Sequence, residues 1–144
     1  MMKTVKDLLR DKGQAVWSIN ADASVLDALK LMAAKEIGAL MVMEGGQLVG
    51  VMSERDYARK VVLRGKSSKD TPVREIMTPK VLYVRPEQTV EECMALMTDK
   101  HVRHMPVIDG DTMIGVVSIG DIVKSVISEQ QFLISHLEHY IRGR

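Results

Sequence analysis

The sequence predicts an α/β fold built from two pseudo-symmetric repeats of element order β-α-β-β-α, with their small sheets packed together and a helix added at the C-terminus. Residues 24–61 align with residues 89–126 at an offset of 65 without a gap, which marks an internal duplication. Helical and strand periodicities then alternate in the same order in both halves. A length of 144 residues suits two small interlocked halves rather than two large domains.

Each repeat opens with a short strand and an amphipathic helix. We expect the strands over residues 16–19 and 81–84. Capping-box patterns begin at Ser24 and at Thr89, where a helix N-terminus is therefore predicted. Apolar residues then recur at helical spacing, so each helix has one buried face. These residues are Val25, Leu29 and Met32 in the first repeat and Val90, Met94 and Met97 in the second.

Two strands joined by a tight turn follow the first helix of each repeat. The turns contain Gly45 and Gly110, in the segments Glu-Gly-Gly and Asp-Gly-Asp, which favour hairpins. A second helix is predicted to begin near Ser53 and near Ser118. The strands are expected over 39–43 and 47–52 in the first repeat, and over 105–108 and 112–117 in the second.

A polar linker over residues 65–72 separates the repeats. We therefore assign residues 1–70 to the first repeat, 71–127 to the second and 128–144 to a C-terminal helix. That helix carries an apolar stripe, which needs a partner surface on this chain or another. The stripe consists of Phe132, Leu133, Leu137, Tyr140 and Ile141.

Composition excludes several classes of function. A net charge of +1 gives no field for nucleic acid or an anionic membrane, and 3% aromatic residues leave little to stack bases on. The single cysteine, Cys93, lies among apolar residues and is expected to be a buried thiol in a reducing compartment. The N-terminus has no apolar signal region, and no apolar run approaches the ~18 residues of a membrane helix. We expect a cytoplasmic protein.

The most informative motif occurs twice, because segments 50–56 and 115–121 both have the pattern Gly-x-x-Ser-x-x-Asp. One interpretation is structural: the glycine ends a strand, and Ser-x-x-Asp caps the next helix. The other is functional: helix N-terminal amides and the serine attract an anion, while the aspartate accepts hydrogen bonds from a ribose diol. The two interpretations do not exclude each other.

The duplicated unit resembles the cystathionine-β-synthase (CBS) domain, two of which form a Bateman module. The resemblance rests on the element order, the repeated motif and the segment Arg103-His-Met-Pro-Val-Ile-Asp109, and it covers roughly residues 5–126. The chain is also similar to small stand-alone CBS-pair proteins. In that case no catalytic domain remains, and a regulatory module is expected.

The resemblance implies binding of adenosine-containing ligands, such as AMP, ADP, ATP, NAD or S-adenosylmethionine, in two clefts between the repeats. In the family the motif aspartate holds the ribose hydroxyls and the serine helps to hold phosphate. Other family positions face phosphate or form an apolar adenine slot, although ordinary core packing is the simpler account of each apolar residue. The positions carried over are Asp56, Asp121, Ser53 and Ser118 for the motif; Arg55, Gly120, Gly38, Arg103 and His104 near phosphate; Ile19, Ile37, Ala39, Val84, Val102 and Met105 for adenine; and Pro106 as a further nucleotide-binding position.

The two clefts are expected to be unequal. Arg55 in the first motif corresponds to Gly120 in the second, and the basic pair Arg103 and His104 corresponds to residues 38–39, which are Gly and Ala. The cations elsewhere on the second helices are more simply a solvated face. These cations are Arg59, Lys60, Arg64 and Lys124.

Other chemistries find less support. The pairs His101-x-x-His104 and His136-x-x-His139 lack an accompanying cysteine or carboxylate cluster, so no metal is expected. Gly65-Lys66-Ser67 matches the end of the phosphate-loop motif, but that motif also needs a glycine at position 60, where this chain has Lys60. The leading hypothesis is a non-enzymatic, homodimeric module that senses energy or redox state through adenine nucleotides and signals to an unidentified downstream protein. The alternatives are a structural interaction module without ligand and a nucleotide-processing enzyme, for which no general base is placed.

Overall fold

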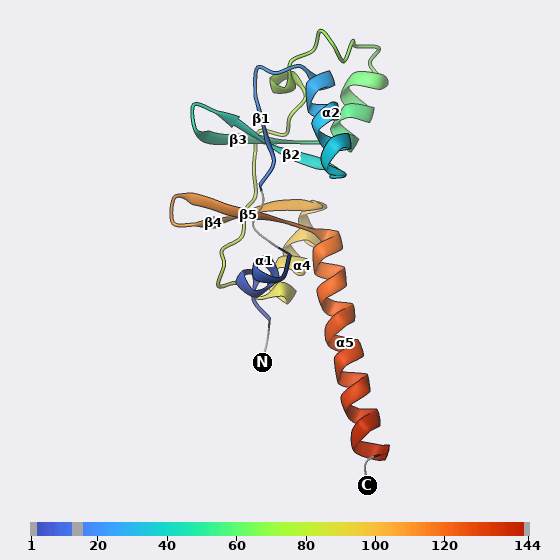
Figure 1. Cartoon of the computed structure of the whole chain (residues 1–144). Coiled ribbons are helices and arrows are strands. Elements are labelled where there is room, and N and C mark those ends of the chain that lie inside the picture. The colour runs from blue at the N-terminus through green and yellow to red at the C-terminus, as the bar shows by residue number, and fades with distance from the viewer. Residues whose placement is uncertain (1–2, 13–15, 143–144) are drawn as a thin grey trace. The chain divides into compact units, whose positions relative to one another are not determined.

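The computed structural model of the chain describes residues 3–12 and 16–142, which fall into two compact units (Figure 1). The repeat-1 unit contains Val16–Leu82. The repeat-2 unit joins the described N-terminal residues to the segment that begins at Tyr83. Both units mix helices with a small sheet, which confirms the predicted α/β class. In the described part of the chain no helix is long and apolar enough to span a membrane.

The repeat-1 unit is built on a three-stranded sheet of order β1-β2-β3. β1 lies parallel to β2, and β2 lies antiparallel to β3 with a register shift after Val42. The second helix is short and continues into a π-helical turn, η1. The elements are β1 (Ser18–Asn20), α2 (Val25–Lys35), β2 (Ala39–Glu44), β3 (Gln47–Ser53), α3 (Glu54–Tyr57), η1 (Ala58–Val62) and the 3-10 turn η2 (Val73–Glu75).

Helix α2 shows why these residues fold as predicted. The Ser24 side chain accepts a hydrogen bond from the Asp27 amide at 3.0 Å and so caps the first turn. Val25, Ala28 and Met32 are buried at helical spacing. The helix ends at Glu36, whose φ of 55° is left-handed and terminates the α-helical hydrogen bonding. The predicted helix is confirmed, and of its predicted buried face Val25 and Met32 are buried while Leu29 is half-buried against the core.

The repeat-2 unit contains a two-stranded antiparallel sheet and three helices among its described residues. The helix that follows the hairpin runs without interruption into the segment that we expected to be a separate C-terminal helix, because nothing in the chain near Ser128 breaks the helix. Together they form one helix of 24 residues. The elements are α1 (Val5–Lys12), α4 (Val90–Lys100), β4 (His104–Asp109), β5 (Thr112–Ser118) and α5 (Ile119–Arg142).

The strand predicted over 81–84 is reduced to a single parallel bridge between Val84 and Val107. Proline explains the difference from β1. In the repeat-1 unit the Ala21 and Met41 amides donate to Met43 and Trp17 and so extend the ladder. The corresponding residues of the second repeat are Pro86 and Pro106, which have no N–H group to donate.

The segment that leads into each repeat packs on the other repeat. Thr4 bridges Thr89 at the start of α4, and the Val5 amide donates to Gln88 at 2.8 Å. In the corresponding place, Pro72 bridges Ser24 at the start of α2, and the Val73 amide donates to Ala23, also at 2.8 Å. The compact units therefore exchange these leading segments and do not follow the sequence boundary that we place near residue 70.

Candidate functional site

In the repeat-1 unit the end of β3 and the start of α3 form a reciprocal capping box. The Asp56 amide donates to Ser53 Oγ at 3.2 Å, and Asp56 Oδ2 accepts from the Ser53 amide at 2.9 Å and from its hydroxyl at 3.1 Å. The Asp56 side chain is only 14% exposed. The structural interpretation of the motif is thus realised, and the carboxylate is held in a fixed orientation.

The other oxygen of Asp56 has its own partners. Lys60 Nζ lies 3.3 Å from Oδ1 and also donates to the Ile76 carbonyl at 3.0 Å, while Thr78 Oγ1 lies 3.5 Å from Oδ1. Lys60 is half-buried, so our assignment of it to a solvated face is wrong. The i, i+4 spacing from Asp56 was the available signal for this ion pair. Thr78 could not be found this way, because η2 and the residues after it are brought to β3 only by the fold.

The repeat-2 unit builds the same cap with different surroundings. Asp121 Oδ2 accepts from the Ser118 amide at 2.9 Å, and the Asp121 amide donates to Ser118 Oγ at 3.1 Å. The residue at the Lys60 position is Ser125, which is 7% exposed. Its hydroxyl oxygen has no hydrogen-bond partner among the described residues. The second aspartate thus has no lysine four residues further along the helix.

The phosphate-facing candidates lie at the same strand ends as the aspartates. In the repeat-1 unit the Gly38 carbonyl accepts from the Glu54 amide at 3.0 Å, and Ala39 pairs in register with Ser53. In the repeat-2 unit the Arg103 carbonyl accepts from the Ile119 amide at 2.8 Å, and His104 pairs with Ser118. Arg103 and Gly120 are exposed, as is Arg55 beside Asp56. The basic residues and the motif therefore meet at one end of each hairpin.

The apolar candidates are mostly packed into the units. Val84 and Met105 are completely buried, and Pro106 and Ala39 are buried too. Ile19 and Ile37 are half-buried and pack against the core of the repeat-1 unit. Ile19 pairs in register with Val42, three residues along β2 from Ala39, so it lies away from the capping box. Val102 is half-buried.

The motif glycines have a role that the sequence did not reveal. Gly50 lies inside β3, where a Cβ atom would stand 2.6 Å from the Met77 sulfur. Gly115 lies inside β5, where a Cβ atom would stand 2.7 Å from a methyl carbon of Leu9. The glycines do not end their strands, as one interpretation supposed. They admit the exchanged leading segments.

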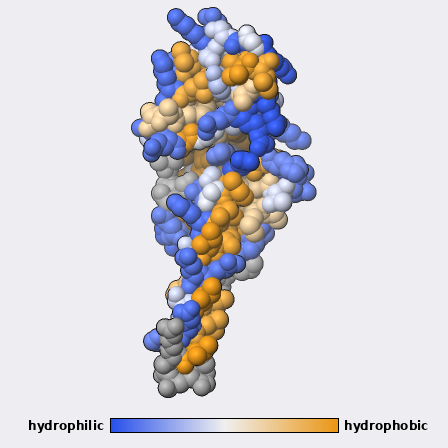
Figure 2. Space-filling model, turned by 90° about the vertical axis from the view of Figure 1, so that its right-hand side faces the viewer, coloured by the Kyte–Doolittle hydropathy of each residue, from blue (hydrophilic) through white to orange (hydrophobic). Residues whose placement is uncertain are grey.

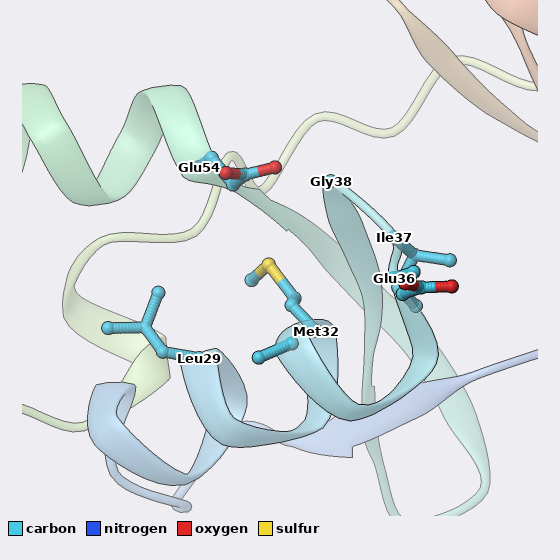
Figure 3. Close-up of a pocket in the computed structure, with 7 residues that line it drawn as sticks. Leu29, Met32, Glu36, Ile37, Gly38 and Glu54 are labelled. Carbon is cyan, nitrogen blue, oxygen red and sulfur yellow. The ribbon is translucent and has the colours of Figure 1, made fainter.

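A pocket of about 330 Å³ lies where α2 ends and α3 begins in the repeat-1 unit (Figure 3). Leu29, Met32 and Ala33 give it an apolar wall, and two acidic residues, Glu36 and Glu54, also line it. Like charges repel, so this lining disfavours a phosphate group. Ile37 and Gly38 also line it.

Two further features of the described residues bear on metal binding and on thiol reactivity. No group of three or more His, Cys, Asp or Glu side chains is arranged to hold a metal ion in the described ranges. Cys93 is buried, as predicted, and burial raises the pKa of its thiol to about 11. A thiol that stays protonated at neutral pH is a poor nucleophile.

Comparison with known proteins gives consistent matches. The family model described as CBS domain matches twice, over residues 4–63 and 73–128. The CBS domain-containing protein CBSX3, mitochondrial, of Arabidopsis thaliana is 42% identical over 150 residues, covering 97% of this chain and 72% of that protein. A solved protein with CBS domains from Burkholderia ambifaria MC40-6 superposes with a TM-score of 0.86 at 53% identity, covering 89% of this chain and 96% of that one.

A more distant structure shows the same fold. The CBS domain pair of protein MJ0100 superposes with a TM-score of 0.80 at 24% identity, covering 90% of this chain and 99% of that one. That protein was solved in complex with 5-methylthioadenosine and S-adenosyl-L-methionine.

Proposed function

The chain belongs to the CBS-domain family and carries the domain twice, and from this premise we propose that it is a regulatory module that binds adenine nucleotides. AMP, ADP, ATP and NAD are the ligands proposed. The observation that carries the proposal is the pair of oriented carboxylates, Asp56 and Asp121, each locked by a serine at the end of a hairpin. A fixed carboxylate accepts two hydrogen bonds from the vicinal hydroxyls of a ribose.

The neighbours of the carboxylates support a ligand that also carries phosphate. Arg55, Arg103 and His104 lie at the same strand ends as the two motifs and supply positive charge or hydrogen-bond donors. The adenosine ligands found with protein MJ0100 belong to that protein, but they are consistent with this choice of ligand class. For adenine we propose contact with the half-buried Val102, which precedes Arg103, rather than with the completely buried Met105 or with Ile19, which lies away from the capping box.

We further propose that the two sites respond over different concentration ranges. In the first repeat a ribose must compete with Lys60 and Thr78 for Asp56 Oδ1. In the second repeat Arg103 and His104 stand where the first has Gly38 and Ala39. Because Arg103 and His104 add hydrogen-bond donors for phosphate, the second site is expected to fill first. Signalling then requires that the ligand binds two conformations with different affinity, because a ligand shifts only populations that it distinguishes.

Calorimetric titration with AMP, ATP and NAD tests the proposal. The variants Asp121→Asn and Asp56→Asn keep the size of the side chain and remove the carboxylate charge. Each is expected to abolish binding at its own repeat, so that wild type shows two binding events and each variant one. Glu92→Gln is the matched control, because Glu92 completes the capping box of α4 and has no proposed ligand. No binding by any nucleotide, with both variants matching wild type, contradicts the proposal.

A structural interaction module without ligand is the second candidate. It is favoured by one observation, namely that Ser53 Oγ and Ser118 Oγ both accept hydrogen bonds that cap a helix. It predicts that nucleotides leave hydrogen exchange of both motif segments unchanged, whereas the regulatory module predicts protection there. We propose a homodimer in the cytoplasm, without catalysis, that acts on an unidentified protein. Turnover of a bound nucleotide would revive the enzyme hypothesis.

A further inference from the structure

Helix α5 extends far beyond the contacts of its own unit. Its first part packs against α1, α4 and β5 and buries Ile122 and Ser125. From there an apolar band continues along the helix, as Figure 2 shows. Its members are between 46% and 74% exposed, although apolar side chains normally lose much of their surface to packing. They are Val123, Ile127, Phe132, Leu133, Ile134, Leu137 and Ile141.

The spacing of the band is that of a coiled coil. Six positions follow one another at alternating intervals of four and three residues, as the a and d positions of a heptad do. Five of the six are apolar, and Gln130 is the exception. We call this line of six positions the seam. Its first two residues, Val123 and Ile127, are exposed although they lie in the part of the helix that packs against its own unit. In order, the seam positions are Val123, Ile127, Gln130, Ile134, Leu137 and Ile141.

We propose that α5 pairs with α5 of a second copy of this chain as an antiparallel two-stranded coiled coil. The flanking charges select the direction. Lys124 and Glu138 both fall on the e side of the seam, and in an antiparallel pair e positions of the two helices face each other. Lys124 of each copy then meets Glu138 of the other, which gives two opposite-charge contacts. In a parallel pair e faces g, so Lys124 would meet Ile119 and Glu138 would meet Leu133.

The same register also matches the apolar layers. Ile127 packs on Leu137 of the other copy, Val123 on Ile141, and Gln130 on Ile134, each layer occurring twice. Leu133 faces its own counterpart at the centre.

The seam from Val123 to Ile141 is about 27 Å long. Phe132 lies outside the seam and stacks on His136, with ring centroids 6.3 Å apart. This pairing does not depend on nucleotide binding.

Cross-linking of the full-length chain decides both pairing and direction. Ile127→Cys and Leu137→Cys are purified separately and treated with a short bifunctional thiol reagent, alone and as a mixture. In the antiparallel pair each introduced thiol lies about 15 Å from its own counterpart, so neither variant links to itself. Only the mixture gives a cross-linked dimer. Wild type, whose single Cys93 is buried, is the control. Self-linking of either variant alone indicates a parallel pair, and no linking in the mixture indicates no pair; both overturn the proposal.

Charge reversal tests the register with surface changes that leave the fold intact. Lys124→Glu and Glu138→Lys each place like charges opposite one another, and each is expected to raise the dimer dissociation constant about tenfold. The double variant restores opposite charges and the wild-type constant. Sedimentation equilibrium measures the constant. The proposed register is wrong if the effects of the two charge reversals on the dissociation constant simply add in the double variant. It is also wrong if no variant changes the constant.

Discussion

The two repeats place the same motif on the same backbone but surround it differently. Asp56 is held by Ser53 on one oxygen and by Lys60 and Thr78 on the other. Asp121 has the serine cap, with the buried Ser125 at the Lys60 position. The duplicated serine and aspartate thus fix the orientation of each carboxylate. The environment of the carboxylate depends on the residue four positions later, Lys60 or Ser125, and on the exchanged segment, which brings Thr78 to Asp56.

The largest difference that we expect between the repeats concerns the exchanged segments. Leu9 is fully buried beside Gly115, whereas Met77, which has the same place beside Gly50, is half-buried. Leu9→Ala should lower the free energy of unfolding by about 2–5 kcal/mol, because it leaves a cavity. Met77→Ala should cost only about 1 kcal/mol. Urea unfolding measures both, and equal losses would contradict the comparison.

A second prediction concerns the glycines that receive these segments. Gly115→Ala and Gly50→Ala should each destabilise the protein by about 1–3 kcal/mol, because the new methyl group meets a neighbour at less than van der Waals distance. Gly120→Ala is the matched control, since its Cβ would have only an ordinary 3.6 Å contact with Ser118 Oγ. The prediction fails if all three variants have the same thermal midpoint.

A smaller effect is expected when the first site is made to resemble the second. Lys60→Ser removes the cation beside Asp56 and leaves Oδ1 more open to a ribose hydroxyl. An ion pair of this kind contributes at most about 1 kcal/mol, so nucleotide affinity at the first repeat should rise roughly two- to fivefold. Calorimetry in the Asp121→Asn background isolates that site. Unchanged or weaker binding would show that Lys60 does not compete with the ligand.

The smallest expected effect concerns Cys93, which has the place in α4 that Ala28 has in α2. Because burial raises the pKa of the thiol to about 11, the native protein should not react with a thiol reagent at pH 8. The stability due to the buried neutral thiol is fully present below pH 9 and is lost as the pH rises toward 11, because the unfolded thiol ionises first. Rapid labelling of native protein at pH 8 would contradict this.

The sequence alone predicted the features that depend on local chemistry. Capping patterns and apolar spacing located α2 and α4, and the duplication located both motifs. It could not place Thr78 on Asp56, because that contact needs the segment after Pro72 to return to β3. It also missed that Pro86 and Pro106 together remove the ladder of the second repeat's first strand, since each proline acts on a partner far along the chain.

The exchange of leading segments also bears on the order in which the protein is made. The repeat-1 unit has all its parts once Leu82 has left the ribosome, because the segment that packs on it, from Val73 to Thr78, lies within the same unit. Helix α1 is synthesised first, but Gln88, which accepts a hydrogen bond from the Val5 amide, appears more than eighty residues later. Leu8 and Leu9, which are buried in the folded protein, therefore stay exposed while the first unit folds. Contacts between residues so distant in sequence also form slowly. A nascent chain that stalls before α4 should be a better chaperone substrate than the finished protein.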